Sequence, residues 1–356
     1  MNYLASKNRP QLLHELSTNT YDLLVIGGGI TGAGIALDAA SRGLKVALIE
    51  KDDFGAGTSS KSTKLIHGGL RYLKQFEIQL VREVGQERAT VHRLAPHLVL
   101  PEKMLLPLVK GGTYGPWATS VGLYVYDFLA GVKGDDKRRM LNKKNTMQKE
   151  PLLSPEGLLG SGYYAEYRTD DARLTIENIK TAFSYGAQCI NYVKADSFIY
   201  ENEQIKGANA IDTLSGDTIA IKAEYVISAA GPWVDTLRKE DQSLQGKHLF
   251  LSKGVHIVVP FEKLPIKQSI YFDNDDGRML FAIPRNRVTY IGTTDTPYKG
   301  DLDRIPIDLE DVNYLLRATN QMFPDIELKV EDVESSWAGL RPLIFEEGKS
   351  ASEMSR

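Results

Sequence analysis

The stretch that most constrains the fold of this chain runs from Tyr21 to Glu50, with the sequence YDLLVIGGGITGAGIALDAASRGLKVALIE. An apolar run at Leu23–Ile26 leads directly into a glycine-rich turn at 27–29. A segment of small residues follows, and a second apolar run at Val46–Ile49 ends on Glu50. This order predicts a strand, a tight turn, a helix and a second strand, which together form the β-α-β unit of a dinucleotide-binding domain.

Each glycine in the spacing Gly27-x-Gly29-x-x-Gly32 has a mechanical reason. Gly27 permits the tight turn from strand to helix, Gly29 lets a diphosphate approach the backbone, and Gly32 lets the helix pack closely on the strand. The helix N-terminus offers free amides and a partial positive charge to the anion. Glu50 ends the second strand, where an acid accepts hydrogen bonds from both ribose hydroxyls and repels a 2′-phosphate. The predicted ligand is therefore a dinucleotide of the NAD or FAD type and not NADP.

Composition narrows the class of protein. The chain has 356 residues, of which 42% are hydrophobic, so it can bury a large core and is long enough for two domains. Its 43 basic and 46 acidic residues nearly balance, which argues against nucleic acid as a partner. Cys189 is the only cysteine, so an intrachain disulfide is impossible, and no metal-spaced Cys/His set occurs. We expect no metal site and a reducing, cytoplasmic location.

Neither a signal peptide nor a membrane span is expected. The first twenty residues lack the apolar core of a signal peptide, and no run approaches the ~18 apolar residues that cross a bilayer. The aromatic-rich segment Gly111–Gly131 has two interpretations, core packing or contact with a membrane interface, where Tyr and Trp are favoured. The chain is thus expected to be soluble, or at most to lie on a membrane surface.

The fold class expected from the periodicity is α/β with an α+β second domain. A Rossmann-type domain is interleaved with a largely antiparallel β-sheet domain that holds the substrate, because repeated strands with turn signals begin at Phe250. A further buried strand is expected at Tyr225–Ala230. The predicted dinucleotide-binding domain comprises residues 20–100 and 160–240, with 330–356 as a candidate continuation, and the substrate domain comprises 101–159 and 241–329.

The segment Lys51–Tyr72 is expected to be a long loop, rich in Gly, Ser, Thr and Lys and without a period. Loops of this length within a compact domain are usually functional. Because it leaves the β-α-β unit directly, we expect its hydroxyls and amides to reach the far end of the cofactor. A solvated linker is the alternative interpretation.

Several blocks of the chain resemble one enzyme family. The segment from Gly27 to Leu73 is similar, nearly end to end, to the N-terminal part of FAD-dependent (aerobic) glycerol-3-phosphate dehydrogenases and α-glycerophosphate oxidases, in the D-amino-acid-oxidase-like superfamily. The later blocks ISAAGPWVD (227–235), GRMLFAIPRN (277–286), IGTTDTPYKGD (291–301) and WAGLRPL (337–343) resemble that family in the same order. The resemblance covers about residues 20 to 345. The family's later Gly-Gly-Lys-Leu-Thr block and its C-terminal helical domain are not in this sequence, so a shortened form is expected.

The resemblance implies oxidation of sn-glycerol 3-phosphate to dihydroxyacetone phosphate, with hydride transfer to N5 of FAD and electrons passed on to a quinone or to oxygen. It implies a cytoplasmic enzyme, with the inner face of the cell membrane and a second copy of the chain as candidate partners. Two alternatives stay open: an oxidase or dehydrogenase of an amino acid, an amine or a 2-hydroxy acid on the same fold, and an inactive truncated fragment.

The catalytic residues that the resemblance implies are His67, Arg71 and Arg341. His67 is the first candidate for the general base because imidazole titrates near neutral pH, and His256 is its rival and a substrate-binding candidate. Arg71 and Arg341 form a candidate clamp for the phosphate, since guanidinium groups bind phosphate in a bidentate way. Tyr72 would add a hydroxyl donor. Structural histidines and surface arginines are the alternative interpretations.

The same resemblance implies a set of residues around FAD. Those that hold its ADP half are expected to be Gly27, Gly28, Gly29, Gly32 and Glu50. Those near the ribityl chain and the flavin ring are expected to be Ser59, Ser60, Lys64 and Leu65. Val193 resembles a position whose backbone meets adenine, Ala230 and Gly231 end a strand beside the diphosphate, and Trp233 is expected to pack.

Overall fold

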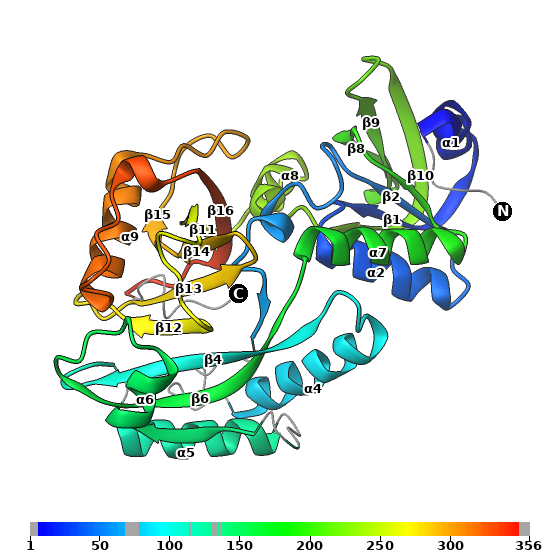
Figure 1. The fold of residues 1–356 in the computed structure, drawn as a ribbon. Coiled ribbons are helices and arrows are strands. Elements are labelled where there is room, and N and C mark those ends of the chain that lie inside the picture. Colours follow the sequence, from blue (N-terminus) through cyan, green and yellow to red (C-terminus); the bar gives the residue numbers. More distant parts are fainter. Residues whose placement is uncertain (1–5, 68–77, 114, 130–133, 135–136, 349–356) are drawn as a thin grey trace.

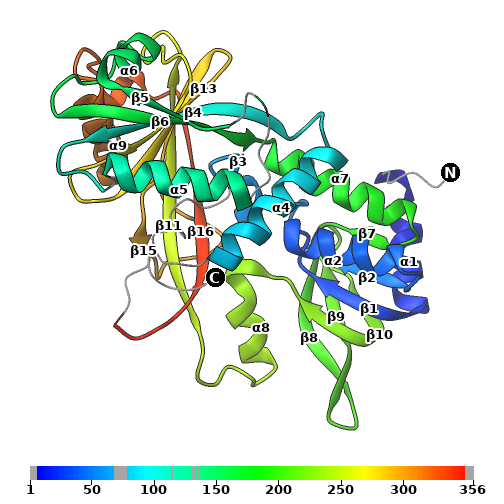
Figure 2. The same ribbon diagram turned by 90° about the horizontal axis from the view of Figure 1, so that it is seen from below.

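The computed structural model describes residues 6–67, 78–113, 115–129, 134 and 137–348. These residues form two β-sheets with helices on their faces, and the sheets lie in separate halves of the molecule (Figure 1). The chain passes from the first half to the second after β2 and returns at the end of β6, as Figure 2 also shows. The predicted α/β fold class is confirmed.

The first sheet grows from the predicted β-α-β unit. Its strands lie in the order β7-β2-β1-β10-β9-β8, of which β7, β2, β1 and β10 are parallel and β10, β9 and β8 form an antiparallel meander. Their bounds are β1 (Thr20–Ile26), β2 (Val46–Ile49), β7 (Gln188–Ile190), β8 (Val193–Glu201), β9 (Gln204–Asp212) and β10 (Thr218–Ser228).

Helices cover both faces of this sheet near β1. Helices α2 (Ile30–Ser41) and α7 (Asp171–Ser184) pack on one face through alanines of α2 and Ile179 of α7, and α1 (Arg9–Thr18) covers the other face with Leu16. Coverage on both sides explains why β1 and β2 are continuous apolar runs rather than alternating ones. The small residues of α2 let it approach the strands closely.

The second sheet has ten strands among the described residues, in the order β15-β11-β14-β13-β12-β4-β6-β3, with β16 beside β11 and β5 beside β6. Except for the parallel pair of β12 and β4, the neighbours are antiparallel. The bounds are β3 (Leu65–Ile66), β4 (Leu100–Val109), β5 (Arg139–Asn142), β6 (Leu158–Arg168), β11 (Leu249–Pro260), β12 (Ser269–Asp273), β13 (Met279–Arg285), β14 (Val288–Gly292), β15 (Thr296–Pro297) and β16 (Ser335–Ile344).

The two faces of the second sheet differ. On one face, alternate residues such as Val255, Ile257 and Ile291 form the largest apolar core with α9 (Leu309–Met322). Asp308 and Asp311 form a capping box at the start of α9, and Asp311 also pairs with the buried Lys253 of β11 at 2.5 Å. The residues between those of the core, including His256, therefore point to the opposite face.

The remaining elements are short or lie at the edges. Helix α5 (Pro116–Leu129) packs on β4 and β6 through Leu123, on the face opposite α9. The others are α4 (Ile78–Leu94), α6 (Lys143–Lys149), α8 (Val234–Glu240) and the 3₁₀ turns η1 (Ser6–Asn8), η2 (Thr58–Ser60), η4 (Gly231–Trp233) and η5 (Val330–Asp332). Among the described helices, none is both long and apolar enough to cross a bilayer.

The structure differs from the sequence-based expectation at three segments. Most of β6, expected in the dinucleotide-binding domain, belongs to the second sheet, and β16 pairs along its length with β11 instead of joining the first sheet. The expectation of a buried strand at 225–230 is wrong, because this part of β10 leaves Tyr225 68% exposed and Ile227 37% exposed. The helices that cover β1 leave these side chains uncovered. The predicted domain limits otherwise stay a prediction.

Candidate active site and cofactor cradle

Strands β1 and β10 end side by side at a turn that glycine alone fits. Gly27 has a φ of +117°, and a Cβ there would lie 2.5 Å from the Ala229 carbonyl oxygen. A Cβ at Gly32 would lie 1.9 Å from the Gly27 carbonyl oxygen. Gly29 caps the N-terminus of α2, and the neighbouring Ile30 side chain is 41% exposed. The first turn of α2 is therefore open at the surface, where an anion can approach the positive end of the helix.

Glu50 lies directly against this turn. Its Oε2 accepts a hydrogen bond from the Gly28 amide at 2.7 Å, and its Oε1 accepts one from the Asp52 amide at 2.9 Å. A carboxylate oxygen accepts two hydrogen bonds, so each oxygen retains one acceptor site for a ribose hydroxyl. Val193, the expected adenine neighbour, is buried beside Glu50 and donates its amide to the Glu50 carbonyl oxygen at 2.7 Å.

The other expected cofactor residues border the same opening. Ser59 Oγ accepts a hydrogen bond from the Ile30 amide at 2.8 Å, so this hydroxyl touches the first turn of α2. Ala230 follows β10, and its nitrogen would lie 3.1 Å from a Cβ on Gly27. Gly231 has a φ of +51° and begins η4. The structure thus brings together the glycine turn, the end of β10 and the Ser59 loop.

Lys64 has a structural task that the sequence did not reveal. Its ammonium donates to the Ser60 carbonyl oxygen and to Asp171 Oδ1, both at 2.9 Å, while Ser62 Oγ donates to the other oxygen of Asp171 at 2.6 Å. These contacts tie the loop to the first turn of α7, and Leu65 then pairs with β6. The Lys64 charge is therefore already engaged in holding the loop, and its contact with a flavin stays a prediction.

His256 is buried on β11, between Gly292 of β14 and Trp337 of β16. Its ring stacks on that of Trp337 with centroids 4.7 Å apart, and its Nε2 lies 3.0 Å from Thr63 Oγ1. A Cβ on Gly292 would lie 2.1 Å from the ring, so glycine is required opposite this histidine. Burial, assisted by the charge of Arg341, lowers the pKa of His256 to about 3. The imidazole is therefore neutral at physiological pH.

The backbone and hydroxyl around Thr63 are held from a second side. Tyr290 donates its hydroxyl to the Thr63 carbonyl oxygen at 2.9 Å. Burial raises the pKa of Tyr290 to about 12, so the hydroxyl keeps the proton that this hydrogen bond needs. His256 and Tyr290 thus fix both the side chain and the carbonyl of one loop residue.

Arg341 lies next to His256 on the same face. On β16 it stands opposite Ser252, and a Cβ on Gly254 would lie 2.7 Å from its Nη2. The guanidinium therefore lies over Gly254, two residues from His256. It donates to Thr293 Oγ1 at 3.1 Å, and its Nη1 lies 3.3 Å from Asp295 Oδ1. The Arg341 side chain is 24% exposed, so it can meet a ligand from solvent.

His67 is exposed and lies on this face as well. Its ring centroid is 6.0 Å from that of Phe281, which stands opposite Gly292 in the pairing of β13 with β14. Arg71 and Tyr72 lie outside the described residues. The predicted clamp of two arginines therefore stays a prediction, supported here by the position of Arg341.

One loop joins the cradle to this face. Thr58 Oγ1 donates to the Leu340 carbonyl oxygen of β16 at 2.8 Å, and Trp337 Nε1 donates to the Ser62 carbonyl oxygen at 3.2 Å. The same loop touches α2 through Ser59. The glycine cradle and the face that carries His256 and Arg341 therefore border one site.

Sequence reasoning missed several residues of the site, namely Thr63, Asp171, Gly254, Thr293 and Trp337. A signal existed for one of them. In GVHIVVP, residues two apart on a strand share a face, so Gly254 marks a gap beside His256 that a neighbouring side chain fills. The others depend on pairing between distant strands.

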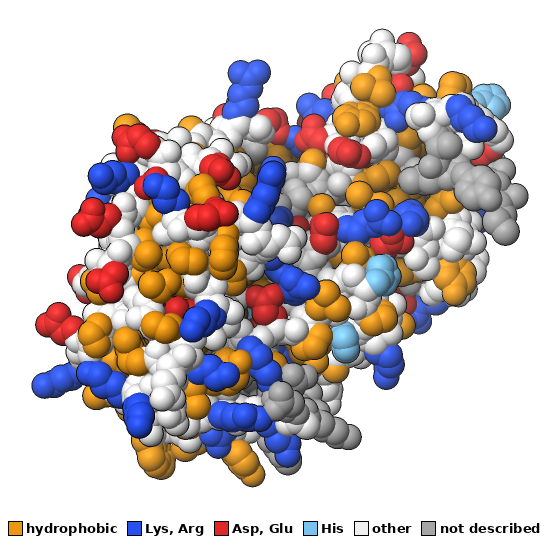
Figure 3. Space-filling model, viewed as in Figure 1, with side chains coloured by type: hydrophobic (Ala, Val, Ile, Leu, Met, Phe, Trp, Pro, Cys, Tyr) orange, Lys and Arg blue, Asp and Glu red, His pale blue; other side chains and the backbone are white. Residues whose placement is uncertain are grey.

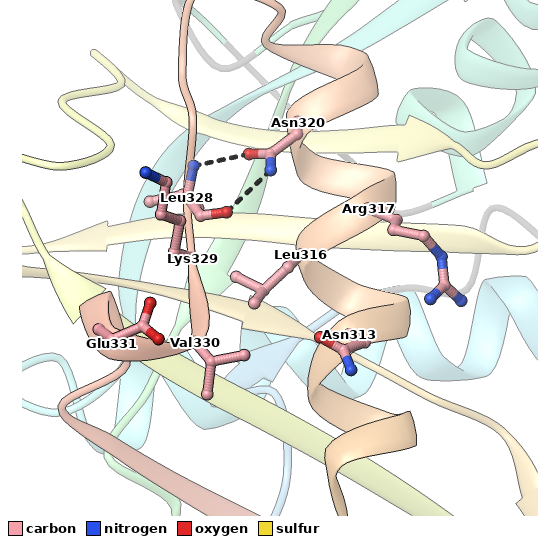
Figure 4. Close-up of a pocket in the computed structure, with 8 residues that line it drawn as sticks. All are labelled: Asn313, Leu316, Arg317, Asn320, Leu328, Lys329, Val330 and Glu331. Atoms are coloured by element: carbon pink, nitrogen blue, oxygen red, sulfur yellow. Dashed lines mark hydrogen bonds between the residues drawn. The ribbon is translucent and has the colours of Figure 1, made fainter.

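A separate hollow of about 410 Å³ lies beside α9 (Figure 4). Asn320 spans it by hydrogen bonds at 2.9 Å to both the amide and the carbonyl of Leu328. Because α9 covers the face opposite His256, this hollow is not part of the candidate site. Within the described ranges, no group of three or more His, Cys, Asp or Glu side chains is arranged to hold a metal ion.

The fold and the cradle define a dinucleotide-dependent oxidoreductase, and the chain belongs to the FAD dependent oxidoreductase family, whose model matches residues 22–352. It is 56% identical to the aerobic glycerol-3-phosphate dehydrogenase of Bacillus subtilis (strain 168), over 99% of this chain and 63% of that protein. Identity to the enzyme of the same name from Staphylococcus aureus (strain MRSA252) is 55%, over 99% of this chain and 64% of that protein. The chain thus spans a little under two thirds of these relatives.

Two solved structures of related function have a similar fold. The glycerol-3-phosphate dehydrogenase of Bacillus halodurans, complexed with FAD, superposes with a TM-score of 0.82 and 49% identity, covering 95% of this chain and 60% of that one. The L-alpha-glycerophosphate oxidase of Mycoplasma pneumoniae shares the fold, with a TM-score of 0.73 and 18% identity over 94% of this chain and 85% of that one. The predicted family and its cofactor FAD are confirmed, and the glycine turn, the open α2 terminus and Glu50 fit that cofactor.

Proposed function

We propose that this chain carries the FAD-binding and substrate-binding parts of an enzyme that oxidises sn-glycerol 3-phosphate to dihydroxyacetone phosphate. When bound, FAD supplies a hydride acceptor at N5. The observation that carries the proposal is the position of the Arg341 guanidinium over Gly254, beside the neutral His256 and on the face bordered by the Ser59 loop. The names of the relatives support the choice of substrate.

Arg341 is the proposed anchor of the phosphate group. The contacts with Thr293, Thr294 and Asp295 hold the guanidinium from the protein side, and its exposed part offers donors to a dianion. Asp295 Oδ1, at 3.3 Å from Nη1, offsets part of the positive charge, and a phosphate that carries two negative charges is attracted to the guanidinium more strongly than a monoanion. The predicted Arg71 would supply the second half of this clamp.

His67 is the proposed general base, and His256 a neighbour that stays neutral. The His67 ring is exposed and so can reach a substrate hydroxyl, whereas Nδ1 of His256 is buried and without a hydrogen-bond partner in the described part of the chain. A neutral His256 also avoids a third positive charge near Arg341 and Lys64. The proton of the C2 hydroxyl would thus leave through the accessible imidazole.

The test is reduction of the bound flavin without oxygen. The purified chain, loaded with FAD, is expected to lose its yellow colour with glycerol 3-phosphate and to keep it with glycine, L-proline, benzylamine and L-lactate. If one of those compounds bleaches the flavin and glycerol 3-phosphate does not, the substrate belongs to one of the alternative classes, namely an amino acid, an amine or a 2-hydroxy acid. If no compound bleaches the FAD-loaded chain, the result supports the alternative that the chain is an inactive fragment.

We infer that α5 contacts the surface of a membrane and that the electron acceptor meets the protein near this contact. The side chains of Trp117, Val121 and Tyr124 are 81%, 44% and 61% exposed, and their spacing places them on one side of the helix. The Arg138 guanidinium lies 5.5 Å from the Tyr124 ring, and Lys and Arg side chains gather with apolar ones along the lower edge of the molecule (Figure 3). Exposed aromatic rings beside basic groups suit an anionic lipid surface.

Vesicle binding tests the membrane contact. Sedimentation with phosphatidylglycerol vesicles is expected for the wild-type chain and to be reduced for Trp117→Ser with Tyr124→Ser, whereas Tyr185→Ser, exposed on the other half of the molecule, should bind normally. Equal binding of all three proteins would remove α5 from the contact.

The rates at which a soluble quinone and dissolved oxygen reoxidise the reduced chain distinguish the two predicted electron acceptors. Light scattering tests the predicted homodimer.

A further inference from the structure

Three residues from separate parts of the chain meet at the surface. Lys51 lies two residues after the end of β2, Trp233 ends the η4 turn after β10, and Asp303 lies in the loop 298–308 between β15 and α9 of the second half. Lys51 Nζ pairs with Asp303 Oδ1 and lies 4.2 Å from the centroid of the Trp233 ring. Trp233 Nε1 donates to the same Asp303 oxygen at 3.1 Å. We call Lys51, Trp233 and Asp303 the clasp.

The clasp borders the cofactor cradle. A Cβ on Gly57 would lie 3.2 Å from the Trp233 ring, so this ring packs directly on the turn that carries Ser59. Ser59 in turn touches the first turn of α2. Lys51 follows Glu50, whose carboxylate accepts the Gly28 amide. Lys51 is therefore the neighbour of Glu50, at the expected ribose position. Trp233 packs on the turn whose Ser59 borders the expected diphosphate position.

The third member comes from the other half of the molecule. The cradle itself is built by the ends of β1, β2 and β10 of the first sheet, whereas the Asp303 loop precedes α9 of the second sheet. Within this loop the backbone is fixed, because the Asp303 amide donates to Asp301 Oδ1 at 2.9 Å and Tyr298 donates its hydroxyl to the Asp301 carbonyl oxygen at 2.7 Å. A preformed loop thus presents one carboxylate to the rim of the cradle.

The exposure of the clasp suits a contact that opens and closes. The side chains of Lys51 and Asp303 are 23% and 60% exposed, so water and salt reach their ion pair. Exposed ion pairs are weak and sensitive to salt. Asp52 Oδ2, at 3.4 Å from Lys51 Nζ, offers the lysine a second partner when the pair opens.

We propose that the clasp retains FAD, with Asp303 as the residue of the second half that closes over the ADP end of the cradle. The proposal rests on the family's cofactor and is independent of the substrate. Dissociation of FAD then requires the Lys51–Asp303 contact to open. Asp303 and Trp233 are positioning residues in this scheme, because they act on the cofactor through Lys51 and the Ser59 turn.

The test is the dissociation rate of FAD from the loaded chain, followed by the rise of flavin fluorescence after dilution. Asp303→Asn removes the negative charge of the clasp and is expected to raise the rate about twofold to fivefold. The matched control is Arg304→Gln, which removes one charge from an exposed side chain of the same loop and should leave the rate unchanged. Trp233→Phe keeps the ring and loses its N–H donor, so a smaller increase is expected.

The effect of salt on the dissociation rate of FAD distinguishes the loss of an ion pair from a general loss of structure. Raising the salt from about 50 mM to about 500 mM should speed dissociation in the wild-type chain, because ions screen the pair, and should have a smaller effect on Asp303→Asn. Equal rates for wild type and Asp303→Asn, or an equal increase in Arg304→Gln, would overturn the clasp. If the chain binds FAD but wild type and Asp303→Asn release it at equal rates, only the clasp proposal is contradicted. If the chain binds no FAD, the cofactor assignment and the clasp proposal are both contradicted.

Discussion

His256 and Trp337 face each other across β11 and β16, and their rings stack with centroids 4.7 Å apart and planes 10° from parallel. The indole also donates its N–H to the Ser62 carbonyl oxygen, and the imidazole meets the Thr63 hydroxyl. One pair of stacked rings on the second sheet therefore holds two consecutive residues of the loop that borders the cofactor cradle. The second sheet thus helps to position this loop, together with the contacts of Ser62 and Lys64 with Asp171 of α7.

Replacing Trp337 should expose this dependence. Trp337→Leu removes the stacked ring and the donor to the loop, and we expect a loss of about 3 kcal/mol in the free energy of unfolding, within the range for a large aromatic side chain. Urea denaturation of the chain measures the change. Trp117→Leu is the control because that indole is 81% exposed, and it should change stability by less than about 0.5 kcal/mol. Equal losses in both variants would show that the stacking contributes nothing particular.

Arg341 is expected to control affinity for the phosphate. Losing a charge-assisted contact costs about 1.5–3 kcal/mol, so Arg341→Ala should raise KM for glycerol 3-phosphate roughly tenfold to a hundredfold. Arg341→Lys keeps the charge without the planar fork and should fall between wild type and alanine. The matched control is Arg317→Ala, on α9, which covers the opposite face of the sheet. Steady-state kinetics decide, and an unchanged KM in Arg341→Ala would remove this residue from the site.

Gly254 is expected to be needed for the position of Arg341 rather than for the fold. In Gly254→Ala the new Cβ would meet Nη2 of Arg341 and Oγ1 of Thr293, both at 2.7 Å. The end of the arginine can swing away, so we expect a stability change within about 1 kcal/mol but a rise of about tenfold in KM. Gly34→Ala in α2 meets nothing within 4 Å and should stabilise the chain by about 0.5–1 kcal/mol with KM unchanged. A normal KM in Gly254→Ala would contradict this account.

The sequence predicted the parts of the fold that depend on contacts nearby in the chain. The glycine turn, the apolar runs of β1 and β2 and the acid at Glu50 lie within one segment, and their geometry follows from steric limits on a strand-turn-helix unit. The FAD family followed from blocks that keep their order along the chain. These predictions needed no knowledge of which distant strands are neighbours.

The partners of individual side chains could not be predicted in this way. Trp337 faces His256 because β11 and β16 pair in one register, and a shift of one residue would turn either ring to the other face. The bond from the Lys64 ammonium to Asp171, on a helix 107 positions away, also depends on distant neighbours, while the expected contact of Lys64 with the flavin stays a prediction. The expected burial of Tyr225 failed for a related reason, since an apolar strand does not specify where the covering helices end.

The neutral state of His256 predicts how stability depends on pH. Burial, with the charges of Arg341 and Lys64, lowers the pKa of this imidazole to about 3, whereas an imidazole in the unfolded chain titrates near 6.5. Between these values the unfolded state binds more protons than the native state. The free energy of unfolding should therefore fall as the pH falls below about 6.5, with a slope of up to about 1.4 kcal/mol per pH unit from this group.

His256→Gln isolates that contribution because glutamine does not titrate. The variant should be less stable than wild type at pH 7.5, since it loses the stacked ring, but the difference between the two proteins should shrink as the pH is lowered from about 6.5 to 5. Urea unfolding at each pH gives both curves. His14→Gln, which replaces an exposed histidine of α1, controls for the chemical change and should give a curve parallel to wild type. Parallel curves for His256→Gln and wild type across this range would mean that burial does not keep His256 neutral, and the proposed division of roles between His256 and His67 would fail with it.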